Sequence, residues 1–383
     1  MQTNSEASKD AAIKVEASAE TVAEGASASS DATVMAAGGT GSPGGQDGPH
    51  GVHARKKPRK ASPKRIALGI LVGLFALAMV VVIAFVAYMR IAYASFYGMA
   101  TAAFDTPGIN TGFIPQDLDR ADDGLWLFSG YESDGEPSPI WRRGADGTVS
   151  RIQVQNPDGS PYMGHGGGIT SAFDNVYLTT EGGLLVLSAD EVARASEGQA
   201  VKASAKVDVG FDPAFVNVQD DVLYTGVFYM AGPYETPDSM HLTAPDGTEN
   251  HAVMYAYGRD ASSDWGFADV PEAVYSIPDK VQGMAMTPDG RMVLSTSWGF
   301  SPSVMYSYDV DRLASGGTYD VSGNDVPLVF CEASALAASI EAPPMMEGID
   351  QFDGRLFLSN ESASNKYIFG KLYGGGTVYW IEP

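Results

Sequence analysis

The sequence predicts an all-β fold, a five-bladed β-propeller, preceded by one apolar helix and a polar N-terminal tail. Two features of residues 111–383 predict it. Runs of four to eight apolar, β-branched or aromatic residues alternate with Asp-Gly and Gly-Gly turns. One unit also recurs five times: a short strand with one polar residue, a turn, a hydrophobic strand and a further strand near an acidic turn. Its starts are Gly112, Gly164, Pro213, Val281 and Met346.

The spacing of these units sets the blade number. Repeats of about 40–50 residues with three or four short strands are typical of propeller blades, and longer units carry insertions. The third unit runs to Pro278 and is long enough to hold another blade, so six blades are the alternative to five. An array of β-sandwiches is a further alternative. Helical periodicity is confined to Ala189–Ala195 and Ser334–Ile340, where we expect a turn or two each.

A membrane span precedes the repeats. Ile66–Tyr88 is a run of 23 residues without a charge. As a helix it would be about 35 Å long, enough to cross a hydrocarbon core of about 30 Å. The N-terminal tail is rich in Ala, Gly and Ser and poor in large apolar residues, which favours disorder. We therefore expect a disordered tail at 1–65, a transmembrane helix at 66–89, a stalk at 90–110 and the propeller domain at 111–383.

Charge gives the orientation of the span. Seven basic residues lie between Arg55 and Arg65, whereas only Arg90 is basic between the span and Arg120. The positive-inside rule then predicts a cytoplasmic N-terminus, a lipid bilayer around residues 66–89 and an extracellular C-terminal domain at the cell membrane. The small-x-small sequence Ala92-Tyr93-Ala94 allows signal-peptidase cleavage instead. The apolar run exceeds the usual length of 7–15 residues for a signal peptide, so we favour a retained anchor.

The outer domain is strongly acidic. The chain carries a net charge of −23; the tail to His53 contributes −5 and the basic run +7, which leaves −25 for the rest. Such a surface repels nucleic acid and attracts cations, so nucleic-acid binding is excluded as a function. Cys331 is the only cysteine, so no intrachain disulfide can form and the core must stabilise the domain.

Polar residues in the first strand of each repeat are the candidate site. Because the first strand of each propeller blade lines the central channel, equivalent positions should converge on the axis. These residues are Gln116, His165, Asn217, Gln282 and Glu347, with Asp117 and Asp350 nearby. Buried polar groups require partners, so they predict either a hydrogen-bonded plug of side chains and water or a ligand-binding site.

Calcium is the candidate cofactor at this position. Calcium prefers six to eight oxygen ligands, and Glu347, Gln282 and Gln116 together with strand carbonyls offer oxygens. No EF-hand loop is present. Zinc is disfavoured by five histidines without a metal-binding spacing and a single cysteine.

Three residues are weak catalytic candidates: His165, Glu347 and Asp350. Glu347 and Asp350, with Asp117, could form the carboxyl pair of a glycosidase, and His165 could act as general base beside calcium in a lactonase or an esterase-like phosphatase. The run from Gly164 to Gly168 also matches the oxyanion loop of lipases. That loop requires a G-x-S-x-G nucleophile motif, which is absent, so the run is interpreted as a glycine-rich approach to a strand.

Aromatic residues at strand ends and in loops favour ligand binding. Their rings could stack on sugars or on protein side chains. These residues are Tyr131, Trp141, Tyr229, Tyr234, Trp265 and Trp298.

Several short motifs in fixed order resemble a group of bacterial membrane-anchored or secreted extracytoplasmic β-propeller proteins. The motifs are PQDL from Pro115, HGGG from His165, QGMAM from Gln282, LSTSWG from Leu294 and PPMMEGI from Pro343. The likeness covers most of Gly112–Tyr367. It implies the propeller fold and supplies no activity.

The sequence therefore predicts a ligand- or protein-binding module at the cell surface, because the repeat architecture carries no complete catalytic constellation. The alternative is a calcium-dependent hydrolase of the glycosidase, lactonase or esterase/phosphatase type with its site at the propeller axis. The extracellular ligand or protein partner is not identified by the sequence.

Overall fold

The computed structural model describes residues 62–121 and 124–383, so the expected disordered tail lies almost wholly outside the described residues. The chain divides into two compact units, Met1–Val81 and Val82–Pro383. Helix α2 (Pro63–Ala92) contains the expected span. Within the described part of the chain it is the one helix long and apolar enough to cross a membrane, which fits either an anchor or a signal sequence.

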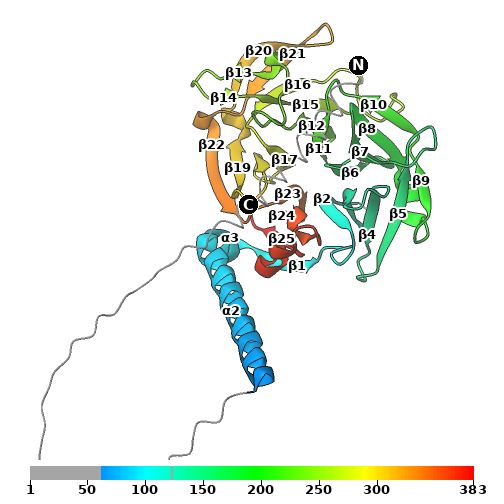
Figure 1. Cartoon of the computed structure of the whole chain (residues 1–383). Helices are drawn as coiled ribbons and strands as arrows, with labels where there is room; N and C mark the ends of the chain where they lie inside the picture. The colour runs from blue at the N-terminus through cyan, green and yellow to red at the C-terminus, as the bar shows by residue number, and fades with distance from the viewer. Residues whose placement is uncertain (1–61, 122–123) are drawn as a thin grey trace, which may run out of the picture. The chain divides into compact units, whose positions relative to one another are not determined.

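The second unit is a five-bladed propeller, which confirms the predicted fold (Figure 1). The first sheet contains β2 (Phe113–Arg120), β3 (Trp126–Glu132), β4 (Pro139–Arg143), β5 (Val149–Gln155) and β9 (Ala200–Lys202). The second contains β6 (Ile169–Ala172), β7 (Asn175–Thr180), β8 (Gly183–Ser188) and β10 (Ala205–Asp208). In each sheet the first strand is the innermost, and β2, β6, β11, β17 and β23 adjoin one another in a closed ring.

The third sheet has six strands, two of which come from the fourth repeat. It contains β11 (Pro213–Gln219), β12 (Val222–Val227), β15 (Ala252–Gly258), β16 (Ala273–Ile277), β21 (Asn324–Phe330) and β20 (Ala314–Val321). The β20–β21 hairpin follows the fourth sheet's β19 in the chain and pairs in parallel with β16. The hairpin thus covers the sheet's outer edge, and the alternative of a sixth blade is wrong. A small hairpin of β13 (Leu242–Thr243) and β14 (Glu249–Asn250) projects from a loop of this sheet.

The fourth sheet contains β17 (Val281–Met286), β18 (Arg291–Thr296), β19 (Ser303–Asp309) and β22 (Leu336–Ala342). Short helices complete the second unit: α3 (Ala94–Met99), α4 (Ala189–Arg194), η1 (Asp238–Met240), η2 (Val310–Arg312), η3 (Ala333–Ala335), η4 (Glu361–Ala363) and η5 (Ile368–Tyr373). The expected helix near Ala189 is therefore α4, whereas Ser334–Ile340 forms the end of η3 and most of β22. Edge pairing with β19 overrides the weak helical pattern there.

The fifth sheet closes the ring with a strand from the expected stalk. It contains β23 (Met346–Phe352), β24 (Arg355–Asn360), β25 (Thr377–Ile381) and β1 (Thr101–Asp105). β1 pairs antiparallel with β25, so the C-terminal sheet receives its outermost strand from the N-terminal side. Residues 90–110 are therefore not a stalk. Phe104 gives the reason, since its ring packs 5.3 Å from that of Trp126 and 6.3 Å from that of Phe128 in the first sheet.

The last turns of α2 and helix α3 belong to the propeller core. Met89, Tyr93 and Phe96 are buried in one hydrophobic cluster with residues of the fourth and fifth sheets, among them Leu358 and Ile381. The segment that leads out of α2 is therefore packed against the second unit by apolar burial.

We predict that Phe104→Ala lowers the free energy of unfolding by about 2 kcal/mol, because a partly buried aromatic side chain that joins two sheets is removed. Denaturant titration of the full-length protein in detergent checks this value. Phe300→Ala is the control, because Phe300 is 74% exposed and its loss should change stability by less than about 0.5 kcal/mol. Equal effects of the two changes would contradict the role of β1 in closing the ring.

Candidate functional site

β-Bulges place equivalent polar residues at one end of the channel. The strand register shifts by one residue near the start of β2, β11, β17 and β23. From the register, Gln116, Ala214, Gln282 and Glu347 lie at these shifts. Because a bulge re-aims a side chain, Gln116, Gln282 and Glu347 occupy matching positions at the mouth where the inner strands begin.

Two other candidates lie elsewhere. Asn217 pairs with Tyr224 three residues beyond Ala214, so it lies deeper in the channel, and its side-chain amide donates to Asp350 at 3.4 Å. His165 lies in the loop before β6. The glycines after it pass close to β11: a Cβ on Gly168 would lie 2.4 Å from the Val216 nitrogen. The glycine run is thus explained by close backbone approach rather than by an oxyanion loop.

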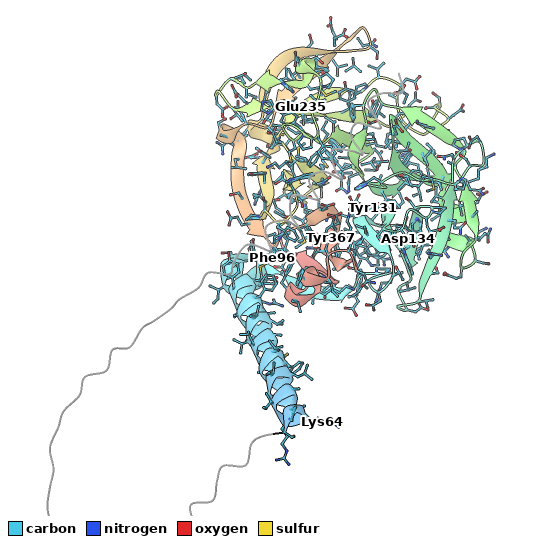
Figure 2. The ribbon with its side chains drawn as sticks, viewed as in Figure 1. Lys64, Phe96, Tyr131, Asp134, Glu235 and Tyr367 are labelled. Atoms are coloured by element: carbon cyan, nitrogen blue, oxygen red, sulfur yellow. The ribbon has the colours of Figure 1, made fainter. Side chains whose placement is uncertain are left out.

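Six side chains from the first, second and fifth sheets and their loops form what we call the channel-mouth site. They are Gln116, Tyr131, His165, Glu347, Glu361 and Lys366. Glu361 is hydrogen-bonded to Glu347 and to Gln116, and the Tyr131 hydroxyl donates to Glu361 Oε1 at 3.3 Å. The rings of Tyr131 and His165 stack with centroids 4.4 Å apart. Figure 2 labels Tyr131 on the first sheet and Tyr367 on the neighbouring loop of the fifth.

The two carboxyl groups influence each other's protonation. Glu347 is 5% exposed, and burial followed by the charge of Glu361 raises its pKa well above the usual range. Burial also raises the pKa of Glu361, an effect opposed by the Lys366 ammonium. Adjacent carboxylates repel each other, so ionisation of one disfavours ionisation of the other. When one of the two is protonated, the pair presents one hydrogen-bond donor and several acceptor positions.

His165 contributes a neutral imidazole. Desolvation by the surrounding protein lowers the pKa of His165 to about 4, and the charge of the Lys366 ammonium is the second cause of this lowering. The His165 side chain is nevertheless exposed to solvent, so water at the ring lessens the lowering of its pKa. Either way, the ring is uncharged at neutral pH.

Three aromatic rings adjoin the carboxyl pair. Phe228, Tyr234 and Trp298, from loops after β12 and β18, have centroids 5.3–5.9 Å apart. The charge of Glu361 contributes to raising the pKa of Tyr234, which links this aromatic cluster to the channel-mouth site.

The remaining aromatic candidates lie outside the site. Trp141 packs against Phe113, Tyr229 stacks on His251, and Trp265 is buried against Tyr177 and Phe267.

The other end of the channel is lined by buried acids. Asp350 accepts hydrogen bonds from the backbone of Arg120 and Gln351 at 3.1 and 2.8 Å, and Asp117 accepts one from Ile169 at 2.9 Å. A cavity of about 300 Å³ opens there, lined by Asp119, Ser171, Gln219, Asp350 and Phe352 among others. Asp350 thus has structural partners at this end. Asp117 lies nearer the carboxyl pair, because its carboxyl group packs against Gly348 and its charge contributes to raising the pKa of Glu347.

The calcium prediction for Glu347, Gln282 and Gln116 stays a prediction. In residues 62–121 and 124–383, no group of three or more His, Cys, Asp or Glu side chains is placed to hold a metal ion. The predicted ligand set contains one carboxylate, and amide and carbonyl oxygens supply the rest.

Sequence reasoning missed Glu361 and Lys366. A signal was available in the second strand of each repeat rather than the first. Four residues occupy matching positions, because each follows the residue that pairs with the last inner-strand residue before the bulge: Tyr131, Phe228, Ser297 and Glu361.

The fold and the site define a five-bladed propeller with a polar and aromatic channel mouth. No protein-family model matches the sequence, and no curated protein matches it. Similar solved structures include the PQQ-bound aldose sugar dehydrogenase of Streptomyces coelicolor (15% identity, 74% of this chain and 98% of that one, TM-score 0.41). A putative glucose dehydrogenase from Thermus thermophilus is 13% identical over 74% of this chain and 98% of that one, with a TM-score of 0.37. A putative gluconolactonase is 13% identical over 75% of this chain and 94% of that one, with a TM-score of 0.33. Likeness at this level carries no inference about activity.

We predict that Glu347→Gln stabilises the protein at neutral and alkaline pH. The raised pKa of Glu347 means that the folded state keeps a proton that the unfolded chain releases. This contribution is complete below the usual glutamate pKa of about 4.3 and is lost, at up to about 1.4 kcal/mol per pH unit, as pH rises towards the folded-state pKa. The difference in melting temperature between variant and wild type should therefore widen from pH 4 to pH 8.

Glu249→Gln on exposed strand β14 is the matched control, and its pH profile should parallel that of the wild type. A gap between Glu347→Gln and wild type that stays constant with pH would rule out the raised pKa of Glu347.

Proposed function

We propose that the protein is a membrane-anchored, extracytoplasmic β-propeller that binds a small, uncharged, hydroxyl-bearing ligand at the channel-mouth site. The carboxyl pair Glu347–Glu361 is the observation that carries this proposal. With one of the two groups protonated, the pair offers both a donor and acceptors, which suits hydroxyl groups that both donate and accept.

The neighbouring groups favour the same ligand class. Gln116 and neutral His165 add uncharged hydrogen-bonding groups, and the ring cluster of Phe228, Tyr234 and Trp298 offers aromatic surface for the C–H faces of a sugar or polyol. The net charge of −23 disfavours polyanionic ligands.

The packing around the end of α2 favours a retained anchor over a cleaved signal sequence. The junction Ala92-Tyr93-Ala94 lies between α2 and α3, where the Tyr93 backbone N–H donates to Met89 O at 3.0 Å and its side chain is 8% exposed. Cleavage after Ala94 would remove Met89 and Tyr93 from the core cluster. Together with the basic run before the span, this packing supports a propeller outside the cell and a tail in the cytoplasm.

A panel of neutral monosaccharides, disaccharides and polyols tests the binding proposal. We expect at least one compound to raise the melting temperature of the full-length protein in nanodiscs, because a ligand that binds the folded state stabilises it. Glu361→Gln and Trp298→Ala should each weaken binding at least about tenfold, equivalent to about 1.4 kcal/mol, by calorimetric titration. Glu249→Gln should bind like the wild type. Stabilisation that is unaffected by either site variant would contradict the proposed site.

A hydrolase is the second candidate, favoured by the same pair, since one proton between two carboxyl groups supplies a general acid and a general base. The pair is in direct hydrogen-bond contact, closer than the roughly 5 Å separation of glycosidase carboxyls. In the described residues no group of three or more His, Cys, Asp or Glu side chains is placed to hold a metal ion, so the calcium-dependent form rests on the sequence pattern. Turnover of a panel compound that disappears in Glu361→Gln would favour the hydrolase over the binding module.

The proposed anchor and its orientation can be tested separately. Protease added to intact cells should degrade the chain beyond Asp105 and leave the N-terminal tail protected, because the tail lies in the cytoplasm. Immunoblotting with tail-directed and C-terminal antibodies measures both fragments. A soluble domain in the medium that begins at Ser95 would show cleavage instead.

A further inference from the structure

The loop between β24 and β25 carries an exposed apolar ridge. The ridge consists of Ile368, Phe369 and Leu372 on η5, with exposed fractions of 59%, 64% and 36%. Outside α2, the other large exposed apolar residues of the second unit, such as Val149 and Phe300, are separated from one another in the sequence. Three such side chains within five residues of a short helix mark a surface that is covered by something other than water.

The ridge adjoins the last turns of α2. Tyr373, the final residue of η5, has its ring centroid 6.2 Å from that of Phe85, and its carbonyl accepts a hydrogen bond from the Tyr97 hydroxyl at 2.5 Å. Phe85 lies inside the uncharged run Ile66–Tyr88. A residue of the span and the residue next to the ridge are therefore in contact, which puts η5 at the depth where the span ends.

The surrounding residues are those of a membrane interface. Tyr88, Tyr97 and Tyr367 are exposed or half-buried and lie on the two segments that meet here. Tyrosine is enriched at membrane–water boundaries because its ring is apolar and its hydroxyl is polar. Arg90 lies over the Tyr97 ring at 3.9 Å, and basic side chains at the end of a span extend towards lipid headgroups.

We propose that the η5 ridge inserts into the outer interface of the lipid bilayer that holds α2. This inference rests on the membrane anchoring in the proposed function and adds a second contact with the membrane. The lipid surface is the occupant because the ridge is continuous, through Tyr373 and Phe85, with the apolar span. The same loop supplies Glu361 and Lys366 to the channel-mouth site, so insertion holds that site close to the membrane surface.

Single cysteines carrying a polarity-sensitive fluorophore test the insertion in the full-length protein. The native Cys331 is buried, and burial raises the pKa of its thiol to about 12, so labelling is directed to the introduced cysteine. Phe369→Cys and Leu372→Cys report on the ridge. Leu74→Cys, in the middle of the span, reports on the anchor. Val149→Cys is the exposed control, because Val149 begins β5 at the opposite end of the channel from the mouth.

The labelled proteins are placed in phosphatidylcholine vesicles with or without lipids that carry a nitroxide quencher on the acyl chain. We expect quenching at positions 369 and 372 to approach that at position 74 and to exceed that at position 149 several-fold, while aqueous iodide quenches position 149 most strongly.

Each contrary outcome is decisive. Quenching at 74 without quenching at 369 or 372 overturns the insertion and leaves the anchor intact. Absence of quenching at 74 overturns the anchor and the insertion together. A blue-shifted label at 369 that is unaffected by the nitroxide lipid and depends on the protein-to-lipid ratio shows that a second copy of the chain covers the ridge, which also overturns the insertion.

Discussion

The pairing of β1 with β25 is the interaction on which the rest of the structure depends. Without it the fifth sheet would lose its outermost strand, and Phe104 would no longer join the fifth sheet to Trp126 and Phe128 of the first. The channel-mouth site spans this same junction, because Tyr131 comes from the first sheet and Glu361 from the loop of the fifth. Ring closure by a strand from the other end of the sequence therefore positions the hydrogen bond at the centre of the site.

Burial of acidic groups near the axis sets the chemistry of this channel. The domain carries its charge mostly as exposed carboxylates, many of them in Asp-Gly turns, where hydrogen bonds from the turn hold the pKa of Asp158 and Asp246 low. Along the channel the direction reverses, and burial raises the pKa of Asp117, Glu347 and Asp350. The surface carboxylates repel anions, whereas burial in the channel favours the protonated, uncharged form of its carboxyl groups. This contrast suits uncharged ligands.

Local pattern predicted the blades, because alternating runs and Asp-Gly turns are short-range signals. The predictions from local pattern were wrong where the structure depends on contacts between residues far apart in the sequence. The role of residues 101–105 depends on β25, nearly three hundred residues later, and the third sheet receives β20 and β21 from the fourth repeat through the parallel pairing of β21 with β16. In the site, Gln116, Gln282 and Glu347 followed from repeat position, whereas Asn217 was displaced because the bulge in β11 falls at Ala214. Glu361 escaped notice because it lies after the second strand, where no pattern in a single repeat marks it.

The short connection between α2 and β1 has a mechanical consequence. α2 ends at Ala92 and β1 begins at Thr101, with the intervening segment packed in the core, so a pull on α2 is not absorbed by a slack tether. The load passes to apolar packing around Tyr93 and Phe96 and then to the β1–β25 ladder. With α2 as the membrane anchor that we propose, tension between the membrane and anything held by the propeller would act on the closure of the ring itself.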